Sequence, residues 1–291
     1  MKRLFLGLAL SLSILTSGCT NASFFAANLP THFDDVRIAH DIAYGPDADQ
    51  TLDIYRLPER GKKTPLPVII FFYGGRWETG GKEDYRFVGS ALAKAGFLVV
   101  IPDYRKYPAV KFPAFIDDAA RAIAWTADHV GAHGGDPADL NVAGHSAGAH
   151  IAALAITDPH YLKAFGKTRA TVKKFVGMAG PYAFVPDEED LKAMFGPPAN
   201  YPKMQVTTFI DGKQSPMLLM WGDKDTSVGQ ANLNKLVATI HKKGGCVETK
   251  IYPGIDHAWL IGTLSWVGDA RDTVLADMTG FFKRTECRSG F

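Results

Sequence analysis

The chain has 291 residues, 46% of them hydrophobic, and its 32 Lys and Arg nearly balance its 30 Asp and Glu. This length and apolar content are enough to bury a large core, which excludes a disordered or fibrous chain. No run of five like charges occurs, so the clustered basic face of a nucleic-acid-binding protein is not expected.

The amino terminus has the pattern of an export signal. Lys2 and Arg3 precede the apolar residues 4–15, and the small or polar residues 16–18 follow. The apolar run is too short to span a bilayer, so we expect residues 1–18 to be a signal peptide that is removed on export.

The residues before Cys19 indicate how this signal is processed. They resemble a bacterial lipobox, in which the cysteine is lipidated and becomes the new amino terminus, although Leu15 lies four residues before the cysteine instead of the usual three. We expect lipidation of Cys19, and ordinary cleavage nearby is the alternative. A lipid at this position would anchor a soluble domain to a membrane of the bacterial cell envelope.

After a tether at residues 19–40, short β-branched or aromatic runs alternate with helical patterns. We expect strands at residues 52–57, 68–73, 97–101, 139–143, 174–179, 217–221 and 247–252, and helices at residues 84–94, 115–129, 147–156, 231–243 and 270–283. Apolar strands that alternate with helices predict an α/β fold with a mostly parallel sheet covered on both faces.

The least regular internal stretch is residues 180–214, which are rich in proline and aromatic residues. We interpret this stretch as a short cap inserted over the edge of the sheet and not as a second domain. A single catalytic domain is therefore expected over residues 41–287.

The motif Gly144-His145-Ser146-Ala147-Gly148 lies between an expected strand and an expected helix. In that context a G-x-S-x-G sequence forms a sharp turn that exposes the serine hydroxyl at the carboxyl end of the strand. Glycines are needed on both sides because a side chain there would collide with the neighbouring strand and helix. Ser146 is therefore the candidate nucleophile, and it needs a base within hydrogen-bond reach.

Motif logic for this turn predicts the order serine, acid, histidine along the chain. Of the histidines beyond the first turn of the following helix, His160 precedes every acid that ends a strand, and His241 lies inside a helical pattern. His257 follows the last expected strand, in a loop at the same edge of the sheet as Ser146. His257 is therefore the candidate base.

Two carboxylates follow the expected strand 217–221. Asp225 lies further into the loop and is better placed to reach His257, whereas Asp223, directly after the strand, is expected to cap the turn backbone. We expect Asp225 to fix the tautomer of His257 and to stabilise the imidazolium, with Asp223 as the alternative.

A tetrahedral intermediate needs backbone N–H donors that converge on its oxygen. One donor is expected from Ala147, directly after the candidate nucleophile. The others are expected from Gly74 and Gly75, where bare backbone that follows the strand 68–73 can approach a substrate.

Together these motifs resemble the α/β-hydrolase superfamily, and specifically the small esterases and lipases near the hormone-sensitive-lipase-like carboxylesterases and the kynurenine formamidases. The resemblance spans about residues 41–283. The matching segments are Tyr44-Gly45, Leu52-Asp53-Ile54-Tyr55, Tyr73-Gly74-Gly75-Arg76-Trp77, Pro102-Asp103-Tyr104-Arg105, Gly134-Gly135-Asp136-Pro137 and Gly144-His145-Ser146-Ala147-Gly148-Ala149-His150, with Asp225 and His257. Tyr73 stands where this family usually has a histidine.

The resemblance implies hydrolysis through an acyl-enzyme without a cofactor. Asp103, Tyr104 and Arg105 would brace the edge of the sheet near the oxyanion loop, and a metal site made by His145 and His150 is not expected, because residues five apart do not share a helix face. The topology implied by the resemblance places Cys246 and Cys287 at the edge away from the site. We therefore expect these two cysteines to form a disulfide.

The leading hypothesis is an exported serine carboxylesterase, lipid-anchored as argued from Cys19, that acts on small or medium acyl esters. An arylformamidase-type amide hydrolase is the first alternative. A non-catalytic envelope lipoprotein that kept the hydrolase fold is the second, and it predicts a broken set of catalytic residues. Here Ser146, Asp225 and His257 are all present.

Overall fold

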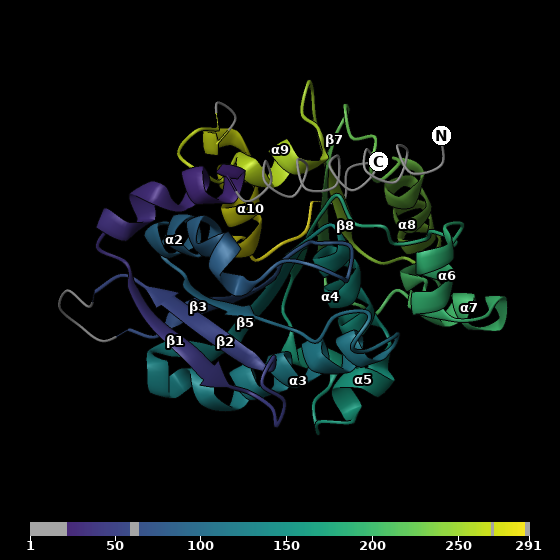
Figure 1. The fold of residues 1–291 in the computed structure, drawn as a ribbon, viewed down its shortest axis with the longest axis horizontal. Helices are drawn as coiled ribbons and strands as arrows, with labels where there is room; N and C mark the ends of the chain where they lie inside the picture. Colours follow the sequence, from purple (N-terminus) through teal and green to yellow (C-terminus); the bar gives the residue numbers. More distant parts are fainter. Residues whose placement is uncertain (1–21, 59–63, 269–270, 289–291) are drawn as a thin grey trace, which may run out of the picture.

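Eight strands form one sheet in the computed structural model, which describes residues 22–58, 64–268 and 271–288. In chain order the strands are β1 (Arg37–Ala43), β2 (Thr51–Arg56), β3 (Leu66–Phe72), β4 (Leu98–Pro102), β5 (Gly135–His145), β6 (Phe175–Met178), β7 (Met217–Gly222) and β8 (Val247–Tyr252). Their order across the sheet is β1-β2-β4-β3-β5-β6-β7-β8 (Figure 1). The β1–β2 and β2–β4 pairs are antiparallel and the other five pairs are parallel, so the expected mostly parallel sheet is confirmed.

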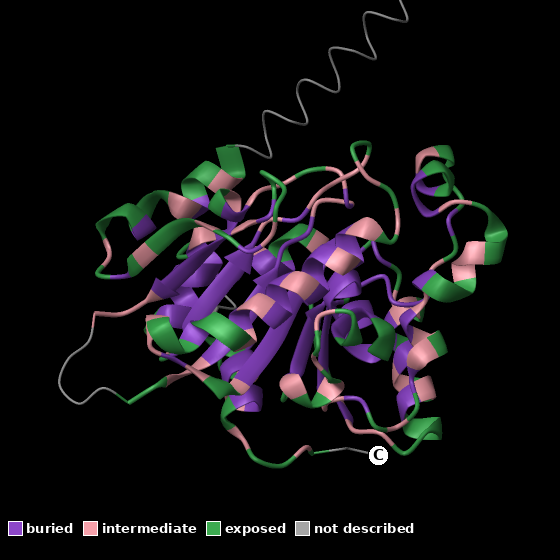
Figure 2. Ribbon diagram, turned by 90° about the horizontal axis from the view of Figure 1, so that it is seen from below, coloured by how far each residue is buried: buried purple, intermediate pink, exposed green. Residues whose placement is uncertain are grey.

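Helices cover both faces of this sheet, and the strands between them are buried (Figure 2). The α-helices are α2 (Arg86–Lys94), α3 (Ala114–His129), α4 (Ala147–Thr157), α5 (Pro159–Lys163), α6 (Glu189–Phe195), α7 (Tyr201–Met204), α8 (Ala231–Lys242), α9 (His257–Gly262) and α10 (Arg271–Lys283). Short 3-10 helices are η1 (Leu29–Phe33), η2 (Lys82–Tyr85), η3 (Val130–His133), η4 (Arg169–Thr171), η5 (Pro198–Asn200) and η6 (Val206–Phe209). The continuous apolar run of β3 is explained by this double cover, because both of its faces are buried.

The parallel strands place several loops at one edge of the sheet. β3 leads to Gly74, β5 to Ser146, β7 to Asp225 and β8 to His257. Because the carboxyl ends of parallel strands meet at the same edge, residues more than a hundred positions apart in the chain become neighbours.

The segment expected to be a tether is packed on the domain from residue 22 onward. Residues 22–28 are helical, η1 follows, and β1 then pairs with β2. The amide of Asn28 donates to the carbonyls of Glu83 and Asp84, and it accepts from the N–H of Phe87. The sequence pattern failed here because β1 is largely exposed and lacks an apolar run.

The insertion 180–214 consists of short helices that pack against α4 and α8. The ring of His150 on α4 donates from Nε2 to the Met204 carbonyl at 2.7 Å, and Asn232 on α8 accepts from the N–H of Ala183 at 2.9 Å. The cap is therefore attached to the helices beside the nucleophile turn.

Several expectations concern the ends of the chain. The signal peptide at 1–18 and Cys19 lie outside the described residues. No helix in the described ranges has both the length and the apolar character to cross a bilayer. Cys246 and Cys287 form a disulfide with Cα atoms 6.3 Å apart, which ties the start of β8 to the residues after α10.

Candidate active site

Ser146 lies on a sharp turn between β5 and α4, with φ 53° and ψ −124°. A non-glycine residue adopts this conformation only where its surroundings hold it, and here the Ser146 N–H donates to the Met178 carbonyl at 2.8 Å. A Cβ at Gly148 would lie 2.2 Å from the Phe72 carbonyl oxygen, so the close approach of α4 to β3 requires glycine there.

The imidazole of His257 joins the serine to a buried carboxylate. His257 Nε2 lies 2.8 Å from Ser146 Oγ, and Nδ1 lies 2.7 Å from Asp225 Oδ2. Because a carboxylate oxygen only accepts, Nδ1 carries the proton in the neutral ring, and Nε2 is free to accept from the serine hydroxyl. This arrangement can transfer a proton away from Ser146.

Asp225 is held in its ionised form. Burial of its side chain would raise its pKa, but the hydrogen bond from His257 and those from the Val228 and Ser227 N–H groups lower the pKa below its ordinary value. Asp223 has a different partner, because its Oδ1 accepts from the Gly254 N–H at 2.7 Å. The structure thus pairs Asp225 with His257. Asp223 instead binds the backbone of residues 253–257, which we name the base loop.

Gly74 and Gly75 begin the loop at residues 74–81, the oxyanion loop. A Cβ at Gly74 would lie 3.0 Å from Ser146 Cβ, so this loop directly adjoins the serine. Gly75 has φ 131°, and its carbonyl accepts from the N–H groups of Glu78 and Thr79. Within the described chain no protein acceptor pairs with the N–H of Gly75 or Ala147. These two donors are therefore available to a substrate oxygen.

Tyr73 supports the oxyanion loop from the core. Its hydroxyl donates to Asp103 Oδ1 at 2.6 Å, and its carbonyl accepts from the hydroxyl of Tyr104 at 3.0 Å. Burial raises the pKa of the Tyr73 hydroxyl well above its usual range, and the charge of Asp103 adds to this. Tyr73 stays neutral and remains a hydrogen-bond donor.

Lys82, at the end of the same loop, has a side chain only 4% exposed. Its Nζ lies 2.7 Å from Asp41, 3.4 Å from Asp103 and 3.7 Å from Asp53. Burial would lower its pKa, but these carboxylates outweigh burial and raise it. The lysine stays charged and links the loop to β1 and β2.

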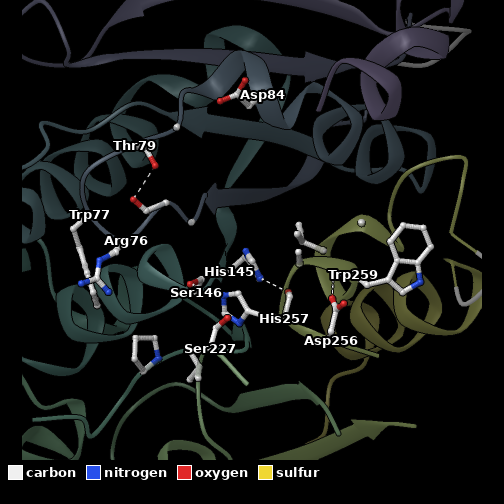
Figure 3. A pocket seen from close by; sticks show the side chains of 18 of the residues that line it. Arg76, Trp77, Thr79, Asp84, His145, Ser146, Ser227, Asp256, His257 and Trp259 are labelled. Carbon is white, nitrogen blue, oxygen red and sulfur yellow. Dashed lines mark hydrogen bonds between the residues drawn. The ribbon is translucent and has the colours of Figure 1, made fainter. Parts of the chain in front are cut away.

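Ser146 and His257 open into a cavity of about 1290 Å³ (Figure 3). Its walls come from the oxyanion loop, the cap, the base loop and the helical residues 22–28. On the cap side Trp77 stacks on Phe184 with ring centroids 5.4 Å apart, and it meets the edge of Phe195 at 5.0 Å. This aromatic wall suits an apolar group of limited size.

Comparison with known proteins places the chain in a family. A family model described as BD-FAE matches residues 52–240. The chain belongs to the BD-FAE family. The expected resemblance to esterases and lipases of the α/β-hydrolase type is thereby confirmed.

Two curated proteins illustrate this likeness. Esterase LipQ of Mycobacterium tuberculosis is 30% identical over 239 residues, which cover 75% of this chain and 56% of LipQ. Isoprenylcysteine alpha-carbonyl methylesterase ICME of Arabidopsis thaliana is 31% identical over 255 residues, which cover 78% of this chain and 58% of ICME. This BD-FAE chain thus spans little more than half the length of these relatives.

A solved structure supports the fold. Esterase B of Lactobacillus rhamnosis superimposes with a TM-score of 0.76 at 21% sequence identity, covering 95% of this chain and 93% of that one. A match of this kind, at 21% identity, concerns the fold alone. It shows that the BD-FAE chain has the α/β-hydrolase architecture, which was the expected fold class.

Histidines 145 and 150 of this BD-FAE chain point to different partners. His145 Nε2 donates to the His257 carbonyl at 3.1 Å, whereas His150 donates to the cap. Burial lowers the pKa of His145 to about 3 and that of His150 to about 4, so both rings are neutral. In the described residues no group of three His, Cys, Asp or Glu side chains is placed to hold a metal ion.

Sequence reasoning missed the contacts that Arg76 makes. Arg76 follows the oxyanion glycines, and its guanidinium pairs with Glu188 at 2.8 Å and Asp190 at 2.7 Å in the cap. It also missed that His145 fixes the base loop. One hint was available from the sequence, which was that Arg76 and His145 lie inside the motifs. Their partners lie about 112 positions away in the chain, so no local pattern could identify them.

Proposed function

We propose that this chain is a serine carboxylesterase that hydrolyses small to medium acyl esters through an acyl-enzyme. The observation that carries the proposal is the continuous hydrogen-bonded line from Ser146 through His257 to Asp225 at the floor of a cavity. Esterases among the relatives support the same class of reaction.

In the proposed first step, His257 Nε2 takes the proton of Ser146 as Oγ attacks the ester carbonyl carbon. Asp225 stabilises the imidazolium that forms. The N–H groups of Ala147 and Gly75 hold the negative oxygen of the tetrahedral intermediate. The Gly74 N–H, expected as a third donor, is instead directed at the Tyr85 hydroxyl. His257 then returns the proton to the departing alcohol, and the acyl group remains on Ser146.

In the second step, His257 removes a proton from water as the water oxygen attacks the acyl carbon. Collapse of the second intermediate releases the carboxylic acid, and the proton returns to Ser146. The protein's own side chains supply every proton transfer, so this cycle needs no cofactor.

The test is labelling by a fluorophosphonate probe together with hydrolysis of p-nitrophenyl esters from acetyl to decanoyl. We expect wild type to be labelled and Ser146→Ala to be unlabelled, with kcat lowered at least about 10³-fold by the loss of the nucleophile. Circular dichroism should show that the variant is folded. Wild-type protein that neither reacts with the probe nor turns over any ester would contradict the proposal and would favour a binding protein. Turnover of N-formylkynurenine in preference to the esters would favour an arylformamidase.

We further infer that the protein is exported and anchored by a lipid on Cys19, in the envelope of a bacterial cell. The basic, apolar and small-residue order of residues 2–19 supports this inference. Mass spectrometry of the amino-terminal peptide should find a diacylated Cys19. A free amino group on a later residue would indicate ordinary cleavage.

A further inference from the structure

Large apolar side chains are exposed around the active-site cavity. Val185 of the cap is 58% exposed, Trp259 of α9 is 39% exposed and Val267 is 43% exposed, and all three line the cavity. Figure 3 shows Trp259 turned away from Ser146 and His257, toward the outside of the site. Trp259 therefore does not cover the reacting groups, and an exposed apolar set at the mouth of a site is typical of an interaction surface.

The helical residues 22–28 and η1 continue this apolar surface. Phe24 and Ala27 face inward and line the cavity, and the ring of Phe24 packs 5.1 Å from that of Tyr85. Phe25 and Leu29, four residues apart on the same side of the segment, are 69% and 45% exposed. The segment is therefore apolar on both sides, and only its inner side has a partner in the described protein.

Trp266 connects the two parts of this surface. Its Nε1 donates to the Ala26 carbonyl at 2.9 Å, while the indole is 54% exposed. Figure 1 shows the start of the purple segment beside α9 and α10, which agrees with this hydrogen bond. We name the exposed set Phe25, Leu29, Val185, Trp259, Trp266 and Val267 the apolar rim.

The short distance along the chain between Cys19 and the rim indicates what contacts the rim. Cys19 precedes the helical residue 22 by three positions, a reach of about 10 Å at most for an extended chain. A lipid on Cys19 would hold this end of the segment, and with it the rim, against the bilayer. Tryptophan is the side chain expected where an apolar surface meets a membrane interface.

The charges beside the rim favour an apolar contact over an electrostatic one. Asp187 and Asp256 line the cavity, and the guanidinium of Arg76 is already paired with Glu188 and Asp190. No cluster of cations is present among these lining residues to attract anionic lipid. The surface therefore fits the neutral, zwitterionic part of a bilayer.

We propose that the apolar rim rests on a lipid bilayer and turns the cavity toward it. The substrate is then an amphiphilic ester that enters the site from the membrane surface, an inference that rests on the proposed function for its chemistry. Burial of several apolar side chains supplies the binding energy, and the contact is insensitive to salt.

The binding test uses the full chain as isolated from the producing cells, with vesicles of phosphatidylcholine that carries brominated acyl chains. Bromine quenches nearby tryptophan, and Trp259 and Trp266 are the reporters. The double variant Phe25→Asp with Leu29→Asp places two charges on the rim outside the cavity. The control is Ile251→Asp on β8, an exposed apolar position that belongs neither to the rim nor to the cavity lining.

We expect quenching of wild type and of the control, unchanged at high salt, and at least a tenfold loss of quenching in the rim variant. The quenching test works with or without the lipid anchor. Even in an anchored chain, Trp259 and Trp266 contact the brominated acyl chains only if the rim rests on the bilayer. Equal quenching of rim variant and control, or none in wild type, would overturn the proposal. If wild type were a dimer and the rim variant a monomer, the occupant of the rim would instead be a second copy of the chain.

Activity separates this inference from the proposed function. We expect the rim variant to retain wild-type hydrolysis of soluble p-nitrophenyl acetate and to lose at least tenfold on p-nitrophenyl decanoate held in vesicles. Quenching without hydrolysis of either ester would refute the esterase and leave the membrane contact. Hydrolysis of both esters at wild-type rates by the rim variant would refute delivery of substrate from the membrane.

Discussion

The base loop at residues 253–257 ends beside Ser146 and the oxyanion loop at residues 74–81 begins beside it, but different groups hold the two loops. Side chains fix the base loop: Asp223 accepts from the Gly254 N–H, and His145 donates to the His257 carbonyl. In the oxyanion loop, side chains hold the two ends through Tyr73 and Lys82. The part beside Ser146 is shaped by its backbone, with positive φ at three consecutive residues, Gly75, Arg76 and Trp77.

This difference follows from what each loop has to present. The base loop presents one imidazole, whose tautomer and direction are set by a carboxylate, so charge is the means of control. Under the proposed function the oxyanion loop presents N–H groups to the substrate oxygen, so the loop cannot be fixed through those same groups. We therefore expect the base loop to be most sensitive to loss of a charge and the oxyanion loop to a change of backbone.

The largest expected effect belongs to the base loop. Asp225→Asn should lower kcat by roughly 10³-fold to 10⁴-fold, because an amide can donate to Nδ1 and stabilise the wrong tautomer of His257. The measurement is kcat for p-nitrophenyl acetate, with circular dichroism as the check on folding.

Asp223→Asn is the matched control, since it changes the same atom of the same residue type two positions away. It should cost no more than about tenfold, because it weakens only the hydrogen bond to Gly254 and leaves the imidazole paired. The reverse ranking of the two variants would assign the acid role to Asp223.

The second effect tests the backbone of the oxyanion loop. In Gly75→Ala the added Cβ would lie 2.2 Å from the Thr79 carbonyl oxygen, and φ of 131° is unfavourable for alanine. The displaced donors should lower kcat by about 10²-fold to 10³-fold.

Gly229→Ala is the control for this substitution. Gly229 also lines the cavity, and a Cβ there would have no atom within 4 Å. Its kcat should equal that of wild type. If both variants were fully active, the oxyanion loop would not supply the donors.

A smaller effect is expected from the support under the oxyanion loop. Tyr73→Phe removes the hydrogen bond to Asp103 and should lower kcat roughly tenfold with little change in KM, because the loop loses position and not substrate contacts. Tyr44→Phe removes a hydrogen bond to the Asp103 carbonyl instead and should leave kcat unchanged. Equal loss in both variants would indicate a general loss of stability, which thermal unfolding would reveal.

The sequence was sufficient for the parts of the molecule that follow a repeating pattern. The buried parallel strands are apolar runs, and the carboxyl ends of such strands meet at one edge, which was enough to place Ser146 and His257 in one region. A strand such as β1, exposed along most of its length, has no apolar run and could not be found in this way.

The contacts between distant segments could not be read from the sequence. Phe24 and Asn28 lie in a segment without clear periodicity, which predicted a tether, and only their partners near Asp84 and Tyr85 show that the segment belongs to the domain. Arg76 in the same way gives no sign of its partners in the cap. Such pairings depend on the loop conformations, which composition and periodicity do not determine.

Substitution of His150, beside the oxyanion loop, should have the smallest effect on activity. It should have a clear effect on stability. This ring is fully buried against Trp77, and burial lowers its pKa to about 4, compared with an ordinary value of 6.5. Between these two pH values the unfolded chain binds a proton that the native chain does not. The free energy of unfolding therefore falls as the pH falls from about 6.5 to about 4, by about 1.4 kcal/mol per pH unit for this residue.

His150→Gln keeps an N–H donor for the Met204 carbonyl but does not titrate. Urea unfolding at several pH values should show a slope of unfolding free energy against pH that is smaller than in wild type by about 1.4 kcal/mol per unit in this window. His241→Gln is the control, because that ring is exposed on α8 and surrounded by water in both states. An unchanged slope in His150→Gln would mean that the native protein protonates this ring, and that the contact between the cap and α4 opens in acid to admit the charge.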